Sequence, residues 1–174
     1  LLSGATYTIG TTVQTYVSTD ASGNSTACSF SVTVTDNELP VITLCQPNIT
    51  TNSASGVCGN NAFWPTPTFT DNCLGGTVVQ TTGLVSGSTF PIGVHPISYT
   101  ITDANGNSAL CSFTVTIVDV EKPSIACLAN ISTVNDPGFC SAVVTYATMN
   151  VTDNCPGAVL TQIGGLASGA NFPA

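Results

Sequence analysis

The segments Ile97–Thr102 (ISYTIT) and Cys111–Ile117 (CSFTVTI) decide the fold of this chain. In both, apolar and hydroxylated residues alternate, which is the pattern of a β-strand with one face on a core and one in water. The link Asp103–Asn107 (DANGN) favours a tight turn, because Asp and Asn side chains bond their own backbone and Gly106 accepts a positive φ. These residues predict a β-hairpin, and Cys28–Val34 (CSFSVTV) predicts a copy of its second strand.

The whole sequence repeats itself, and its cysteines recur in register. Cys45, Cys58 and Cys73 return 82 positions later as Cys127, Cys140 and Cys155, and Cys28 returns 83 positions later as Cys111. A period of this length is that of a small domain with its own core. We interpret the chain as an excerpt of a tandem array. Residues 39–120 form one complete module, 1–38 the C-terminal part of a first and 121–174 the N-terminal part of a third.

Short alternating segments separated by turn residues predict an all-β fold of tandem immunoglobulin-like β-sandwich modules. The expected linkers, Thr35–Pro40 and Val118–Pro123, are short and end in proline, whose fixed φ stiffens the connection. Trp64 lies on an alternating segment. It suits a core position better than a carbohydrate-stacking surface, since large aromatic residues on such strands are usually buried.

The composition excludes several functions. Charged residues make up 6% of the chain, Lys122 is the only basic residue beside nine acids, and the net charge is −8. Without a basic surface to neutralise phosphate, we expect no nucleic-acid partner. No apolar run is long enough for a membrane helix, so we expect no membrane insertion in this segment.

The eight cysteines predict disulfides rather than zinc. No CxxC pair occurs, and the single histidine, His95, has no counterpart in the other copies. Cysteines at a fixed register in small repeated domains are typical of disulfide-stapled proteins outside the cytosol. The expected location is therefore extracellular or on the cell surface.

The chain resembles the hyalin repeat (HYR) module over essentially its whole length. The resemblance rests on the combined order of motifs, which are PxIxC from Pro123, GxC from Gly138, TDNC from Thr152, SGxxFP from Ser168, FPxG from Phe90, YxxxDxxGN from Tyr99 and CSFTV from Cys111. The four-cysteine form is similar to arrays in very large surface adhesins of Bacteroidetes-type bacteria. The family implies an immunoglobulin-like fold and a role in extracellular adhesion or matrix, and it supplies no catalytic residues.

Four cysteines per module allow three pairings. The first and last strands of a sandwich commonly lie side by side, which favours bonding first to fourth and second to third. The expected pairs are Cys45–Cys111, Cys58–Cys73 and Cys140–Cys155, while Cys28 and Cys127 have partners outside the excerpt.

Other candidate sites carry weaker signals. The linker acids Asp36 and Glu38 with Asp71, and their counterparts Asp119, Glu121 and Asp153, offer oxygen ligands of the kind that calcium prefers. The alternative is that these acids cap turns and solubilise the surface. Asn48 and Asn130 fit the glycosylation sequon at equivalent positions, although chains rich in Asn, Ser and Thr produce such triplets by chance.

The predicted function is structural. A catalytic triad needs a histidine to carry the proton, and His95 stands in one copy only, so we expect no enzyme. We predict the stalk or filament of a large cell-surface adhesin, whose partners are neighbouring identical modules and an extracellular protein or glycan. One alternative is that each repeat binds a glycan or protein, and another is a laterally self-assembling extracellular fibre.

Overall fold

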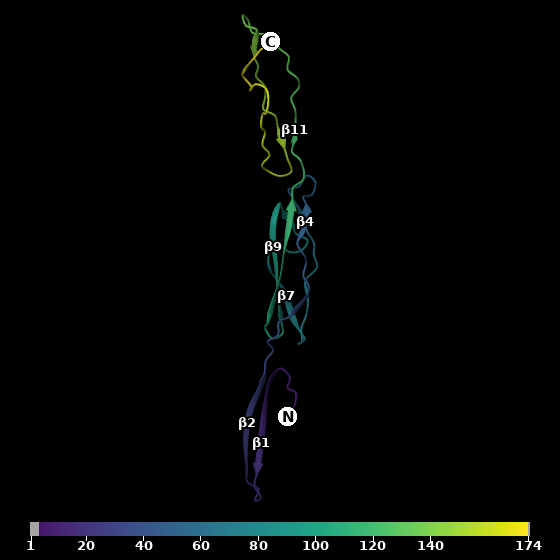
Figure 1. Ribbon diagram of the computed structural model, residues 1–174, viewed down its shortest axis with the longest axis vertical. Coiled ribbons are helices and arrows are strands. Elements are labelled where there is room, and N and C mark those ends of the chain that lie inside the picture. Colours follow the sequence, from purple (N-terminus) through teal and green to yellow (C-terminus); the bar gives the residue numbers. More distant parts are fainter. Residues whose placement is uncertain (1–3, 174) are drawn as a thin grey trace. The chain divides into compact units, whose positions relative to one another are not determined.

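A computed structural model describes residues 4–173, so the first three residues and the last residue of the expected modules lie outside it. The described residues form strands and no helix (Figure 1). The strands are β1 (Gly10–Thr19), β2 (Ser25–Val34), β3 (Val41–Leu44), β4 (Ile49–Asn52), β5 (Gly59–Asn61), β6 (Thr68–Thr70), β7 (Gly76–Thr82), β8 (Thr89–Pro91), β9 (Gly93–Asp103), β10 (Ser108–Val118), β11 (Ser124–Ile125), β12 (Ser141–Val143), β13 (Val151–Thr152) and β14 (Asn171–Pro173). In this part of the chain no helix is long and apolar enough to cross a membrane.

The chain divides into two compact units. The first comprises Leu1–Asn48, Trp64–Ser86 and Pro96–Thr114, and the second Ile49–Phe63, Gly87–His95 and Val115–Ala174. Both units draw on the complete repeat, and the boundaries expected at residues 38 and 120 stay predictions.

The first unit begins with a regular hairpin. Strands β1 and β2 pair antiparallel without interruption from Gly10 opposite Val34 to Thr19 opposite Ser25. In the turn, the Asp20 carboxylate accepts hydrogen bonds from the backbone of Ser22 and Asn24 at 2.9 and 2.8 Å. This is the predicted turn chemistry, in which an Asp side chain replaces a backbone acceptor.

The central sheet has the strand order β4-β10-β9-β7. In β9 and β10 every second side chain is buried, as the alternating sequence predicts. The buried residues are Ile97, Tyr99, Ile101 and Asp103 in β9 and Cys111, Phe113, Val115 and Ile117 in β10. Strand β4 pairs with β10 in parallel, with Ile49 opposite Val115. A strand near the start of the repeat therefore lies beside its last strand.

Trp64 is part of the core of the first unit, with 7% of its surface exposed. Its indole N–H donates to the Tyr99 hydroxyl at 2.8 Å, and that hydroxyl donates to Gln80 Oε1 at 3.1 Å. The indole ring meets the Phe113 ring edge-on, with centroids 5.4 Å apart. Such aromatic pairs contribute about 0.5–1.5 kcal/mol beyond burial. The core interpretation of Trp64 is correct.

The second unit shows the repeat as structure. Strands β5 and β8 pair with Asn60 opposite Phe90, and their counterparts in the next copy, β12 and β14, pair with Ala142 opposite Phe172. Strands β11 and β13 are likewise the counterparts of β3 and β6, which pair in the first unit. Together with the alternating burial of the central sheet, these pairings confirm the predicted all-β, immunoglobulin-like class.

Candidate functional site in the linkers and cysteine turns

The structure contains the predicted bond between the first and fourth cysteines of the complete repeat. Cys45 and Cys111 are joined across 66 residues with their Cα atoms 5.7 Å apart. Cys111 lies on the buried face of β10 and is 2% exposed. The bond therefore clamps the beginning of the repeat to its last strand.

The predicted bonds Cys58–Cys73 and Cys140–Cys155 are wrong. Cys58 is bonded instead to Cys155, 97 residues away, with a Cα–Cα distance of 4.8 Å. Cys73 and Cys140 are free thiols, Cys140 being exposed and Cys73 half-buried. Cys28 and Cys127 are also free and exposed, and their partners outside the excerpt stay a prediction.

Hydrogen bonds around Cys58–Cys155 give the physical reason for this pairing. The turn before Cys58 is closed by a bond from Val57 N–H to the Ala54 carbonyl at 2.9 Å. Asn154 Nδ2 then donates to the Val57 carbonyl at 3.2 Å, and Gly56 N–H donates to a carboxylate oxygen of Glu121 at 2.8 Å. These contacts bring the turn before Cys58 against the turn that carries Cys155, so sulfurs far apart in sequence meet.

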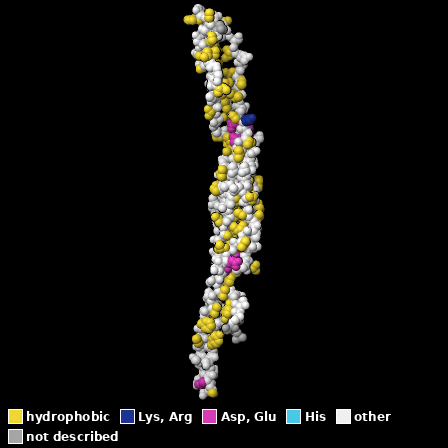
Figure 2. Space-filling model, viewed as in Figure 1, with side chains coloured by type: hydrophobic (Ala, Val, Ile, Leu, Met, Phe, Trp, Pro, Cys, Tyr) yellow, Lys and Arg dark blue, Asp and Glu magenta, His cyan; other side chains and the backbone are white. Residues whose placement is uncertain are grey.

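Acidic side chains gather in a few small groups, one of them beside a basic side chain, and the rest of this face is uncharged (Figure 2). We call Asp36, Asp71 and Cys73 the first acidic cluster; their ligand atoms lie within 4.8 Å of one another. Asp71 accepts a hydrogen bond from the backbone N–H of Cys73 at 2.9 Å, which holds the turn. The backbone N–H of Glu38 lowers the pKa of Asp36 against the opposing effect of burial, and the Cys73 thiol and Asn105 amide lower it further. Burial, with a hydrogen bond to Asp36, raises the pKa of the Cys73 thiol to about 11.

The hairpin turn of the complete repeat holds the linker that precedes it. Asp103, 5% exposed, accepts backbone hydrogen bonds from Asn105 and Asn107 at 2.9 and 2.8 Å and an amide bond from Asn107 at 2.8 Å. Burial raises the pKa of Asp103, but these hydrogen bonds outweigh it and the net pKa is lowered. On its other side, Asn105 Nδ2 donates to the Asp36 carboxylate at 2.9 Å and Asn107 Nδ2 to the Asp36 carbonyl at 3.4 Å. Sequence reasoning found the turn but missed this second role of its asparagines.

The second acidic cluster, Asp119, Asp153 and Cys155, repeats the first with its ligand atoms also within 4.8 Å. Asp153 accepts from the backbone N–H of Cys155 at 2.8 Å, as Asp71 does from Cys73. Asp119 Oδ1 accepts from the backbone of Glu121 at 3.1 Å and from Asn154 Nδ2 at 3.4 Å. The same local geometry is therefore built twice.

The calcium prediction meets these clusters only in part. Each brings two of the three predicted acids together, whereas the carboxylates of Glu38 and Glu121 lie outside both groups. Calcium takes six to eight oxygen ligands, and the sulfur of Cys155 is committed to a disulfide. Two buried oxygens, Asp71 Oδ2 and Asn154 Oδ1, accept no hydrogen bond from the described residues. These oxygens suit a cation, and calcium stays a prediction.

The two sequon asparagines are exposed. Asn48 also has a structural contact, since its Oδ1 accepts the backbone N–H of Thr114 in β10 at 2.9 Å. Asn130 lies in an irregular segment. Glycosylation of either asparagine stays a prediction.

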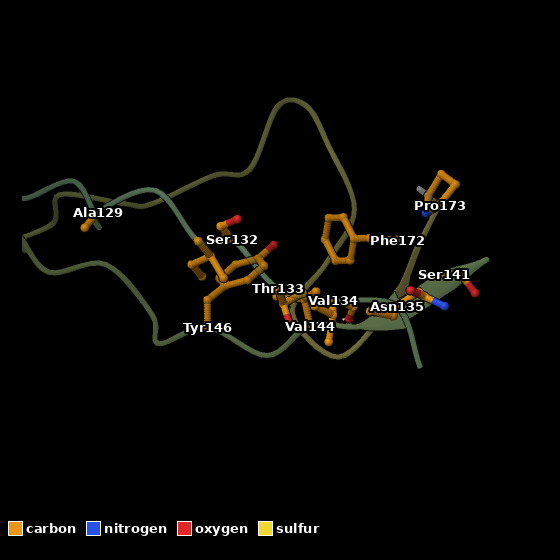
Figure 3. Close-up of a pocket in the computed structure, with 12 residues that line it drawn as sticks. Ala129, Ser132, Thr133, Val134, Asn135, Ser141, Val144, Tyr146, Phe172 and Pro173 are labelled. Atoms are coloured by element: carbon orange, nitrogen blue, oxygen red, sulfur yellow. Dashed lines mark hydrogen bonds between the residues drawn. The ribbon is translucent and has the colours of Figure 1, made fainter. Parts of the chain in front are cut away.

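A cavity of about 480 Å³ lies in the second unit, where Ile131, Tyr146 and Phe172 are among its lining residues (Figure 3). Their counterparts one repeat earlier are Ile49, which is paired with β10, Trp64, which packs on Phe113 of β10, and the fully buried Phe90. These three lining residues thus correspond to positions that pack in the complete repeat. The lining is typical of a surface that packs against a strand rather than of a ligand pocket.

His95 takes part in local structure. Its Nε2 lies 2.9 Å from the Pro91 carbonyl, and its ring is 5.4 Å from the Phe90 ring. The acids of the two clusters lie elsewhere and are bonded to backbone N–H groups. This arrangement supports a structural role for His95.

Comparison with known proteins agrees with the repeat, because one family model matches the chain twice in succession. The HYR domain model matches residues 1–34 and 35–117. Hyalin of the sea urchin Strongylocentrotus purpuratus is 33% identical over 98% of this chain, and hyalin of Lytechinus variegatus is 33% identical over 90%. A rat protein named for sushi, von Willebrand factor type A, EGF and pentraxin domains is 36% identical over 64%. The chain spans 14%, 31% and 3% of the length of these relatives. It belongs to the HYR family, whose members are extracellular structural repeat modules.

Proposed function

We propose that this chain is a segment of the stalk or filament of a large cell-surface adhesin, in which folded repeats in series hold a distal binding element away from the cell. The observation that carries the proposal is the way the linkers are held. The linker residue Asp36 is bound by Asn105 and Asn107 of a hairpin turn. The linker residue Glu121 binds the turn beside Cys58. Bound linkers suit a load-bearing array, because a free linker would bend.

The aromatic residues favour the structural role over a binding role. A repeat that recognises a glycan or protein would expose the same aromatic residue in each copy. In the complete repeat, the aromatic residues with aromatic counterparts are buried, namely Trp64, Phe90, Tyr99 and Phe113. The exposed residues Phe63 and Phe139 have no aromatic counterpart one repeat away, and the exposed Tyr16 and Phe30 of the incomplete first copy correspond to the buried Tyr99 and Phe113. The proposal therefore places ligand binding in other parts of the protein.

The test is an in-frame deletion of one repeat, residues 39–120, from the intact surface protein, with an in-frame duplication of the same residues as the matched control. The deletion is expected to shorten the reach of the filament by one repeat, and the duplication to lengthen it equally. Reach is measured by electron microscopy of the cell surface, and attachment is measured in parallel. Attachment that is lost on deletion of a single repeat would assign binding to the repeat and contradict the spacer role.

A further inference from the structure

The disulfide Cys58–Cys155 joins two different copies of the repeat. Cys58 is the second cysteine of the complete repeat, and Cys155 is the third cysteine of the copy that follows. The bond Cys45–Cys111, in contrast, lies inside one copy. In the complete repeat, the first and fourth cysteines are thus bonded to each other, and the second is bonded to the copy that follows.

Two of the free cysteines, Cys73 and Cys140, occupy the same two environments as this pair. Cys140 follows a turn closed by a bond from Phe139 N–H to the Asp136 carbonyl at 3.0 Å, and the matching bond before Cys58, from Val57 to Ala54, is 2.9 Å long. Cys73 stands in the first acidic cluster as Cys155 stands in the second, and both are half-buried. Cys140 therefore has the local structure of a second cysteine, and Cys73 that of a third.

We propose that in an array of this repeat every junction is closed by a disulfide from the second cysteine of one repeat to the third cysteine of the next. In this series, Cys73 is bonded to the second cysteine of the repeat before it, and Cys140 is bonded to the third cysteine of the repeat after it. The inference rests on the array of the proposed function. Each bond forms when two thiols lose two protons and two electrons to a disulfide oxidant, such as oxidised glutathione, which leaves as two thiols.

The series has a mechanical consequence, because consecutive junction bonds overlap in sequence. The shortest covalent path along the array enters each repeat by a junction bond at its third cysteine and leaves by the next junction bond at its second cysteine. Within a repeat, this path contains only the segment between these two cysteines, such as the one from Cys140 to Cys155. At about 3.5 Å per extended residue, this short segment reaches about 50 Å, whereas a whole repeat reaches about 290 Å. The fully stretched oxidised array would therefore reach about a fifth of the length of the fully stretched reduced one.

The first test counts thiols in the oxidised 174-residue chain by alkylation under denaturing conditions and intact mass. Four alkylated cysteines are expected in the monomer, whereas pairing of second with third inside each repeat would leave two. Peptide mapping at low pH then identifies the bonds. A bond of Cys58 to Cys155, or of Cys140 in one molecule to Cys73 in another, supports the inference, since both join second to third across copies. A bond of Cys58 to Cys73 or of Cys140 to Cys155 overturns it.

A matched pair of variants separates the junction bond from the thiol itself. Cys155→Ser is expected to raise the thiol count from four to five, while Cys73→Ser, in the equivalent cluster, lowers it to three and leaves both bonds in place. Insertion of a second copy of residues 39–120 raises the number of cysteines from 8 to 12 and is expected to leave the thiol count at four. A count of six or more after insertion would overturn the series. These counts do not depend on reach or attachment, so they fail independently of the proposed stalk.

Discussion

Loss of the bond between Cys45 and Cys111 should destabilise the complete repeat by about 4 kcal/mol. The perturbation is the double substitution Cys45→Ala and Cys111→Ala. The bond closes a loop of 66 residues, and in the chain-entropy model a loop of that size contributes about 4.4 kcal/mol. The bond Cys58–Cys155 also connects these two cysteines, by a route of about 57 residues that runs from Cys45 to Cys58 and from Cys155 to Cys111. With this shorter route the expected loss of stability is about 4.2 kcal/mol. Small domains have a total stability of about 5–15 kcal/mol, so this is a large loss.

Urea denaturation followed by tryptophan fluorescence measures this loss. Trp64 is the only tryptophan of the chain and is buried in the complete repeat, so its signal reports the unfolding of that repeat. For a urea dependence of about 2 kcal/mol/M, the midpoint should fall by about 2 M. The dependence itself should increase slightly, because the unfolded chain without the bond is less compact.

The control is Cys28→Ala, which removes an exposed free thiol at the position of Cys111 in the preceding copy. This substitution should leave the midpoint unchanged. A loss below about 1 kcal/mol in the double variant would refute the loop-entropy reasoning. An equal loss of stability in Cys28→Ala would show that the loss comes from replacing a cysteine side chain rather than from removing the disulfide.

Two further predictions concern the acids. The pKa values of Asp20, Asp36 and Asp103 are lowered from about 3.8 in the folded chain, so the unfolded chain binds more protons on acidification. The free energy of unfolding should therefore be constant above about pH 5 and fall as the pH drops below about 4. The urea midpoint measured against pH tests this, and a midpoint that rises on acidification would contradict it. If calcium binds the acidic clusters, a chelator should lower the melting temperature, calcium should restore it, and Asp36→Asn combined with Asp71→Asn should weaken the response. A melting curve unchanged by the chelator would leave these acids as turn caps.

Alternation and turn chemistry made much of the fold predictable from sequence. The strict alternation in Cys111–Ile117 places every second side chain on the core, and the structure buries those residues. Asp103 with the following Asn and Gly residues specified a turn that depends only on neighbouring backbone. The bond Cys45–Cys111 was predictable too, because a strand near the start of the repeat, β4, lies beside its last strand, β10. These features depend on residues within one repeat.

The bond Cys58–Cys155 was not predictable in the same way. The short loop from Cys58 to Cys73 closes at a lower cost in chain entropy than the long loop from Cys58 to Cys155, so local reasoning favours the short pair. The structure decides otherwise because Asn154 and Glu121 bind the turn before Cys58. The sequence did carry a signal, since Glu121 lies in the linker and Asn154 precedes Cys155, but the meaning of this signal depends on contacts between copies.

The two kinds of disulfide compensate for a surface with few charges. Only 6% of the residues are charged, so ion pairs can contribute little to the rigidity of this chain. Its polar contacts are mainly hydrogen bonds from backbone and amide groups, as in the turn of Asp103. Such bonds contribute about 0.5–1.5 kcal/mol each, or more where the acceptor is charged, and they break singly under load. A covalent bond within the repeat stabilises the fold against unfolding, whereas a covalent bond between repeats limits extension once a fold has opened. The proposed stalk would need both to keep its length under tension, and the structure contains one bond of each kind.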